Sequence, residues 1–117
     1  MVNEKAFLFL SETNEMFAIT CPATVGSARD SDVVLEHPYP EPIQVLIRAE
    51  NGEFRAKVEQ GSFKVKSKLG IFPIAVWTTI NGKPLKSDMP IQDGDCLKIG
   101  ANIYWFSLTE QSKLNSL

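Results

Sequence analysis

Apolar and polar residues alternate with a period of two along much of the chain, whereas the spacing of an amphipathic helix hardly appears. In the segment 54–58, apolar residues alternate with Arg55 and Lys57, and similar alternation occurs in 43–48 and 63–66. This period is typical of strands with one buried face, because successive side chains of a strand lie on opposite sides of the sheet. The sequence therefore predicts at least three short strands in its central part.

Residues that favour tight turns separate these runs. Gly and Asn, which tolerate positive φ angles, occur at 50–53, 60–62, 81–83 and 92–95, and a tight hairpin is expected at Asn51-Gly52. Further short strands are expected at Ala6–Leu10, Met16–Ile19, Val33–Leu35, Ala75–Ile80, Cys96–Ile99 and Asn102–Leu108. Many short strands at this spacing predict an all-β domain of about ten strands, arranged as a sandwich or a barrel.

Length and composition fit one domain. The chain has 117 residues, of which 44% are hydrophobic and 22% charged, values of an ordinary domain with its own core. We expect this domain to cover residues 1–110, with a frayed tail at 111–117, and the proline-rich stretch 37–42 to form a surface loop. The longest apolar run, Ala6–Leu10, is far shorter than the ~20 residues of a membrane span. A cytoplasmic or cytoplasm-facing location without membrane contact by this chain is therefore expected.

The net charge and the lack of catalytic motifs argue against several classes of function. Twelve Lys and Arg against fourteen Asp and Glu give a net charge of -2, which does not favour binding to nucleic acid. The single histidine, His37, lies in the expected loop, and Cys21 and Cys96 lack the spacing of a zinc site or redox motif. No phosphate-binding glycine motif is present. We expect no catalytic residue, metal or cofactor, two unpaired and partly buried cysteines, and a protein as the partner.

Carboxylates gather next to turn residues in two places. Asp30, Asp32 and Glu36 form one group, and Asp93 and Asp95 form the other. A calcium loop would need more oxygen ligands at closer alternate spacing. Aspartates beside Gly and Ser more often accept hydrogen bonds from backbone N–H groups, so these groups are expected to stabilise turns.

Basic residues are concentrated in one place. Arg55, Lys57, Lys64 and Lys66 have the same strand parity, and a short hairpin between their strands would place all four on one sheet face. Such a face is either a solvated surface protected from edge pairing by lysine or a docking patch for an acidic partner.

Aromatic residues offer a second candidate surface. Trp77, Trp105, Tyr39 and Tyr104 are the candidates for an exposed anchor. In the segment 102–108 apolar residues occupy both parities, with Trp105 on one and Tyr104 on the other. Either this strand is buried on both faces or Trp105 lies at an interface.

Three segments in order resemble the forkhead-associated (FHA) domain. The segment 24–35, T-V-G-S-A-R-D-S-D-V-V-L, is similar to the family's strand ending in an apolar residue and Gly-Arg, followed by a loop and a strand. The segment 41–47 falls where the family has Ser-x-x-His and the following strand. The segments 80–85 and 91–100 resemble the closing hairpin and the L-x-x-G-D-x-I-x-I-G strand. The resemblance implies an FHA-like β-sandwich of about ten to eleven strands.

FHA domains bind phosphothreonine peptides through loops at one end, but the resemblance implies a degenerate site here. The family's arginine after glycine falls on Ser27, with Arg29 two positions further, the family's serine on Glu41 and its histidine on Gln44. The expected function is a phosphate-independent protein-interaction module, as in cytoplasmic domains of inner-membrane ring proteins of bacterial type III secretion systems. The alternatives are phosphothreonine binding through Arg29, and a small RNA-binding or sulfur-carrier-like domain, which the closing hairpin also resembles.

Overall fold

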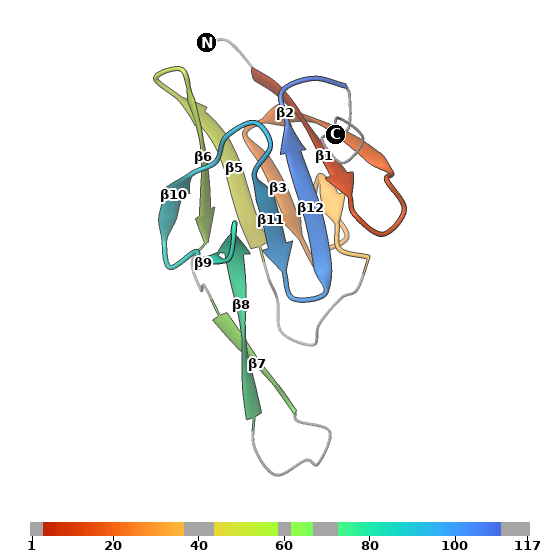
Figure 1. Ribbon diagram of the computed structural model, residues 1–117, viewed down its shortest axis with the longest axis vertical. Coiled ribbons are helices and arrows are strands. Elements are labelled where there is room, and N and C mark those ends of the chain that lie inside the picture. The colour runs from red at the N-terminus through yellow and green to blue at the C-terminus, as the bar shows by residue number, and fades with distance from the viewer. Residues whose placement is uncertain (1–3, 37–43, 59–61, 67–72, 111–117) are drawn as a thin grey trace.

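Residues 4–36, 44–58, 62–66 and 73–110 are described by the computed structural model, and over these residues the chain forms twelve strands and no helix (Figure 1). No helix that could cross a membrane therefore occurs in this part of the chain. The strands form two sheets that pack face to face. The all-β sandwich predicted from alternation is confirmed.

The larger sheet has seven strands. In spatial order they are β2 (Met16–Cys21), β1 (Glu4–Leu10), β12 (Asn102–Ser107), β11 (Cys96–Ile99), β8 (Pro73–Ile80) and β7 (Ser62–Lys66), with β9 (Lys83–Pro84) also paired to β8. The smaller sheet has the order β10 (Asp88–Pro90), β6 (Glu53–Val58), β5 (Gln44–Glu50), β3 (Ala23–Gly26) and β4 (Val33–Val34). The β3–β4 pair is parallel and the other pairs are antiparallel.

Alternate residues of both sheets fill one core. Leu8 and Tyr104 from the larger sheet and Ile47 from the smaller one are fully buried, and the rings of Phe54 and Phe106 meet edge to face at 5.4 Å between centroids. Burial of such side chains contributes about 1.5–3 kcal/mol each relative to exposure. The period of two in the sequence therefore reflects which face of each strand meets the opposite sheet.

The expected hairpin at Asn51-Gly52 is confirmed. Glu50 and Glu53 are cross-strand partners, and Asn51 and Gly52 have φ angles of 54° and 76°. Both central residues have positive φ, as a two-residue turn of type I′ requires. A second hairpin with the same chemistry joins β8 to β9 at residues 81–82.

The strand pairing departs from the prediction after β6. The sequence predicts a hairpin between the strands at 54–58 and 63–66, but β6 pairs with β5 and β10, whereas β7 belongs to the other sheet and pairs with β8. Alternation identifies a strand but not its partner, which is set by contacts distant in sequence. Strands β3, β9 and β10 have no alternating pattern that predicts them. The expected loop at 37–42, the first two residues of the expected turn at 60–62, and the expected tail at 111–117 lie outside the described residues.

Strands β7 and β8 form a two-stranded ribbon that extends beyond the sandwich (Figure 1). The pairing of β8 with β11 covers Thr78–Ile80, whereas its pairing with β7 covers Pro73–Trp77. The ribbon therefore lies at one end of the molecule, whose longest extent is 47 Å against 31 and 27 Å.

Candidate functional site

The end of the sandwich at which β3 ends and β5 begins carries the positions that the resemblance assigns to phosphate binding. Gly26 is the cross-strand partner of Gln44, and the carbonyl of Gly26 accepts a hydrogen bond from the N–H of Leu35 at 2.9 Å. Ser27 is partly buried, whereas Arg29 and Gln44 are exposed. The structure therefore places the Ser27 and Gln44 positions at the same end; Glu41 lies outside the described residues.

Asp32 has a structural role in this loop. Its carboxylate accepts hydrogen bonds from the backbone N–H of Thr24 at 2.8 Å and from the Thr24 hydroxyl at 3.2 Å. The N–H of Asp32 donates in return to the Thr24 hydroxyl oxygen at 3.1 Å. These reciprocal bonds tie the loop to β3, which confirms the expectation that a carboxylate here stabilises a turn.

The second carboxylate group has the same role. Asp95 accepts a hydrogen bond from the N–H of Gln92 at 2.8 Å and one from the side-chain amide of Asn81 at 2.9 Å. Asp93 accepts one from the N–H of Leu108 at 2.9 Å. Both carboxylates hold the turn before β11, as expected from their position beside Gly94.

A shallow hollow of about 170 Å³ lies on the outer side of the smaller sheet. Thr24, Gln44, Leu46 and Lys57 line it. Among the described residues that line it, Lys57 is an exposed cation, Leu46 is apolar, and Thr24 and Gln44 are neutral and polar.

The four basic residues expected on one face do not lie on one face. Arg55 and Lys57 lie on β6, and Lys64 and Lys66 lie on β7, in different sheets. The expectation of a single hairpin face is therefore wrong. Lys57 is exposed, while Arg55 is partly buried and ion-paired.

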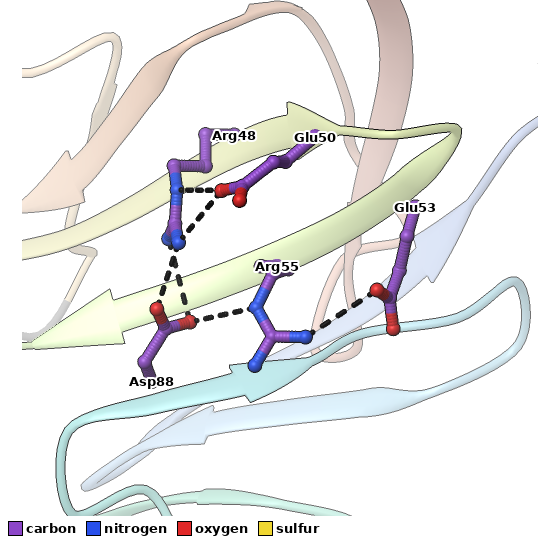
Figure 2. Close-up of polar contacts among 5 residues, drawn as sticks. All are labelled: Arg48, Glu50, Glu53, Arg55 and Asp88. Atoms are coloured by element: carbon purple, nitrogen blue, oxygen red, sulfur yellow. Dashed lines mark hydrogen bonds and ion pairs between the residues drawn. The ribbon is translucent and has the colours of Figure 1, made fainter.

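Arg55 belongs to a charge network on the outer face of the smaller sheet (Figure 2). The Asp88 carboxylate accepts two hydrogen bonds from Arg48, at 2.7 and 3.3 Å, and one from Arg55 at 3.1 Å. Glu50 contacts Arg48 at 3.1 Å, and Glu53 contacts Arg55 at 3.4 Å. Three carboxylates thus neutralise two guanidinium groups, and this region is not a basic docking patch.

The network shifts the pKa values of Asp88 and Arg48. Hydrogen bonds from Arg48 and then from Arg55 hold the pKa of Asp88 below its ordinary value, against the opposing effect of partial desolvation. The hydrogen bond to Asp88 raises the pKa of Arg48. Sequence reasoning missed Asp88 because β10 has only three residues and no alternation, so that nothing local indicates which strand it joins.

The candidate aromatic anchors differ in exposure. Tyr104 is fully buried and is no anchor; its ring packs edge to face on Phe17 at 6.3 Å between centroids. Trp105 is partly buried between its cross-strand partners Phe9 and Cys96. Its indole N–H is buried and has no hydrogen-bond partner among the described residues. Because Phe9 is buried as well, the structure favours a strand covered on both faces.

Trp77 is the exposed tryptophan of the described residues. Its side chain is 40% exposed, and it lies opposite Ser62 where the ribbon leaves the sandwich. Tyr39 lies outside the described residues.

Comparisons with known proteins test the architecture directly. No family model and no curated protein matches the chain. Solved structures do: Mycobacterium tuberculosis EmbR in complex with a low-affinity phosphopeptide matches over 93% of this chain with a TM-score of 0.66 and 15% identity. The fold is that of FHA domains.

Two further FHA structures show the same relationship. One comes from a study of phosphothreonine-dependent FHA domain interactions; it matches over 92% of this chain and 99% of its own, with a TM-score of 0.60 and 15% identity. The other, the FhaA FHA domain complexed with the intracellular domain of Rv3910, matches over 86% and 98%, with a TM-score of 0.56 and 14% identity. This chain spans 26% of the EmbR chain. The FHA-like fold predicted from the three sequence segments is confirmed.

Proposed function

We propose that this domain is a non-catalytic protein-interaction module that binds its partner without a phosphothreonine. One observation carries the proposal: in the segment 27–36, which includes strand β4, the charged residues are Asp30, Asp32, Glu36 and a single arginine, Arg29, all exposed. Ser27 and Gln44, at the end of β3 and the start of β5, are neutral. In this segment, Arg29 is therefore the one cationic donor for a phosphate, and the other three charged residues are acidic.

Electrostatic magnitudes support this proposal. A phosphothreonine carries about -1.5 to -2 charges. Each charge-assisted hydrogen bond contributes about 1.5–3 kcal/mol, so one arginine gives a modest gain. A carboxylate within ~5 Å of the dianion costs on the order of a few kcal/mol at a partly screened dielectric, which cancels that gain.

A second candidate function is phosphothreonine recognition through Arg29. It is favoured by the solved FHA structures that concern phosphopeptides and by the exposure of Arg29, which forms no ion pair with any described residue. This candidate requires the attraction between Arg29 and the phosphate to exceed the repulsion from the three carboxylates of the segment 27–36.

We further propose a larger protein to which this domain belongs. An FHA scaffold without phosphate donors is suited to a cytoplasm-facing part of an inner-membrane ring protein of a type III secretion system, which meets cytosolic proteins. The complete reading frame tests this setting: a membrane span downstream of the domain supports it, and an adjoining kinase or repair enzyme contradicts it.

Fluorescence anisotropy with a degenerate phosphothreonine peptide library and its unphosphorylated counterpart tests phosphate independence. Low salt favours the detection of weak electrostatic binding. We expect equal affinity for both libraries. A preference of about tenfold for the phosphorylated library, equivalent to about 1.4 kcal/mol, overturns the proposal. Loss of that preference in Arg29→Ala would establish the second candidate.

A further inference from the structure

Strand β7 is an edge of the larger sheet. It is the last strand in the spatial order and, among the described strands, pairs with β8 alone. One side of β7 therefore presents backbone N–H and C=O groups that no described strand pairs. In Figure 1 this edge belongs to the ribbon that extends beyond the smaller sheet.

The register of the ribbon separates apolar from polar positions. Phe63 lies opposite Val76, and Val65 lies opposite Ile74. Because cross-strand partners and alternate residues share a face, these four positions lie on one face of the ribbon. They continue the core-facing series of β8, in which Thr78 and Ile80 are buried. The ribbon thus prolongs the core face of the larger sheet past the end of the smaller sheet.

The other face of β7 holds Ser62, Lys64 and Lys66. These lysines lie in a segment whose charged residues are all positive. Residues 60–87 contain five lysines and neither Asp nor Glu, although the whole chain has more acidic than basic residues. A strand added to this edge would therefore meet apolar positions on one face and lysines on the other.

We propose that the edge of β7 binds an extended segment of a partner protein in which apolar residues alternate with Asp or Glu. Main-chain hydrogen bonds along the edge provide affinity, and the alternation provides specificity. The partner's apolar residues would extend the apolar face of the ribbon, and its carboxylates would face Lys64 and Lys66. The inference rests on the proposed function, for which it names the binding surface and the chemistry of the partner.

A second copy of this chain fits the edge less well. Antiparallel pairing of β7 with itself about its centre would place Lys64 opposite Lys64, and parallel pairing would align both lysines with their counterparts. Like charges directly opposite each other destabilise strand pairing. The lysines thus disfavour self-pairing in these registers and favour an acidic strand.

The test uses the whole chain and two short synthetic peptides of equal composition. In the first, valine alternates with glutamate; in the second, all valines precede all glutamates. We expect the alternating peptide to bind at least about tenfold more tightly. Its binding should slow hydrogen exchange of those β7 amides that are not paired with β8. Equal binding of the two peptides, or binding without protection of β7, overturns the inference and indicates a charge effect that any polyanion, nucleic acid included, would produce.

Charge reversal at the edge provides the variant test. Lys64→Glu with Lys66→Glu should weaken binding of the alternating peptide by about tenfold or more, since the facing charges become alike. Lys5→Glu with Lys98→Glu is the matched control, because both residues are exposed, lie on the same sheet outside the ribbon and change the net charge equally. Equal loss in both variants overturns the inference. A phosphothreonine preference in the library titration would refute the proposed function separately, because neither peptide carries phosphate.

Discussion

Asp88 binds the guanidinium of Arg48 across an intervening strand, with 2.7 Å between Oδ2 and Nη2. Asp88 lies on β10 and Arg48 on β5, and β6 lies between them. Arg48 is the cross-strand partner of Arg55, so the carboxylate stands between two like charges that would otherwise destabilise the β5–β6 pair. This contact connects three strands on the outer face of the smaller sheet.

Asp88→Asn should lower the thermal unfolding midpoint at pH 7. The pKa of Asp88 is depressed in the folded state, so its contribution is present above the ordinary aspartate pKa of about 3.9 and is lost as pH falls through the lower folded value. The difference between variant and native protein should therefore shrink in acid, as unfolding followed by circular dichroism from pH 7 to pH 2 would show. Glu53→Gln, which removes one contact of 3.4 Å, is the control with a smaller expected effect. A variant as stable as the native protein at pH 7 would contradict the role of Asp88.

Tyr104→Phe should not destabilise the domain. The ring is fully buried, and its buried hydroxyl has no hydrogen-bond partner in the described part of the chain, so removal of the hydroxyl abolishes a desolvation cost. We expect the free energy of unfolding to rise by about 1 kcal/mol in urea denaturation. Tyr104→Leu, which also removes the contact with Phe17, is expected to be destabilising. A loss of stability in the phenylalanine variant would indicate that the hydroxyl has a partner.

The same tyrosine should make the native domain less stable in alkali. Burial raises the pKa of Tyr104 to about 12, and burial raises the pKa of Cys21 to about 11. In the unfolded chain these groups lose their protons near pH 10 and 9, so stability should fall as pH rises through that range towards the folded values. Urea titrations from pH 8 to 11 would measure this slope, which should be shallower in Tyr104→Phe. An identical slope in the two proteins would refute the assignment to Tyr104.

Cys21 and Cys96 should react as free thiols at different rates. Cys21 is buried, whereas Cys96 is partly buried, and burial raises the pKa of both thiols. Mass spectrometry after alkylation under native, non-reducing conditions should show Cys96 modified first and Cys21 only after denaturation. A mass lower by two hydrogens that resists alkylation until reductant is added would show a disulfide instead.

Asn81→Ala should destabilise the turn that joins the end of β8 to β9. Asn81 has a φ of 53°. Its side-chain NH2 group donates a hydrogen bond to the Asp95 carboxylate at 2.9 Å, and its side-chain oxygen accepts one from the backbone N–H of Cys96 at 2.9 Å. Loss of these bonds at a positive φ should cost about 1–3 kcal/mol in urea denaturation. Asn51→Ala, at the equivalent turn position between β5 and β6, is the control, since φ is again positive and the structure gives it no such side-chain bonds. An equal loss in both variants would assign the effect to backbone strain alone.

Local chemistry made most of the fold predictable. The turn at Asn51-Gly52 depends on φ angles that these residues adopt readily, and the strands at 54–58 and 96–99 depend on the alternation of buried and exposed positions. Pairing of β7 with β8, and of β10 with β6, depends on contacts with distant segments, which alternation does not encode. For this reason, the prediction that the basic residues of β6 and β7 share one sheet face was wrong.

The candidate site was predictable only in part. The sequence, through its resemblance to FHA domains, assigned the family's arginine and histidine positions to Ser27 and Gln44, and the pairing of Gly26 with Gln44 places these positions at one end. It did not indicate that Arg55 would be neutralised, because Asp88 is 33 residues away in the chain. The edge of β7 became evident only from the order of strands in the sheet.

The central claim is that this FHA-like domain binds protein partners through a surface other than the phosphothreonine loops. A titration of the isotope-labelled chain, followed by amide nuclear magnetic resonance, tests it most directly. The probes are a phosphothreonine peptide and the peptide of alternating valine and glutamate. We predict that the alternating peptide shifts amides of β7 and β8, and that the phosphothreonine peptide leaves Ser27, Arg29 and Gln44 unmoved. Saturable shifts at those three residues with the phosphothreonine peptide, absent with its unphosphorylated form, would contradict the account.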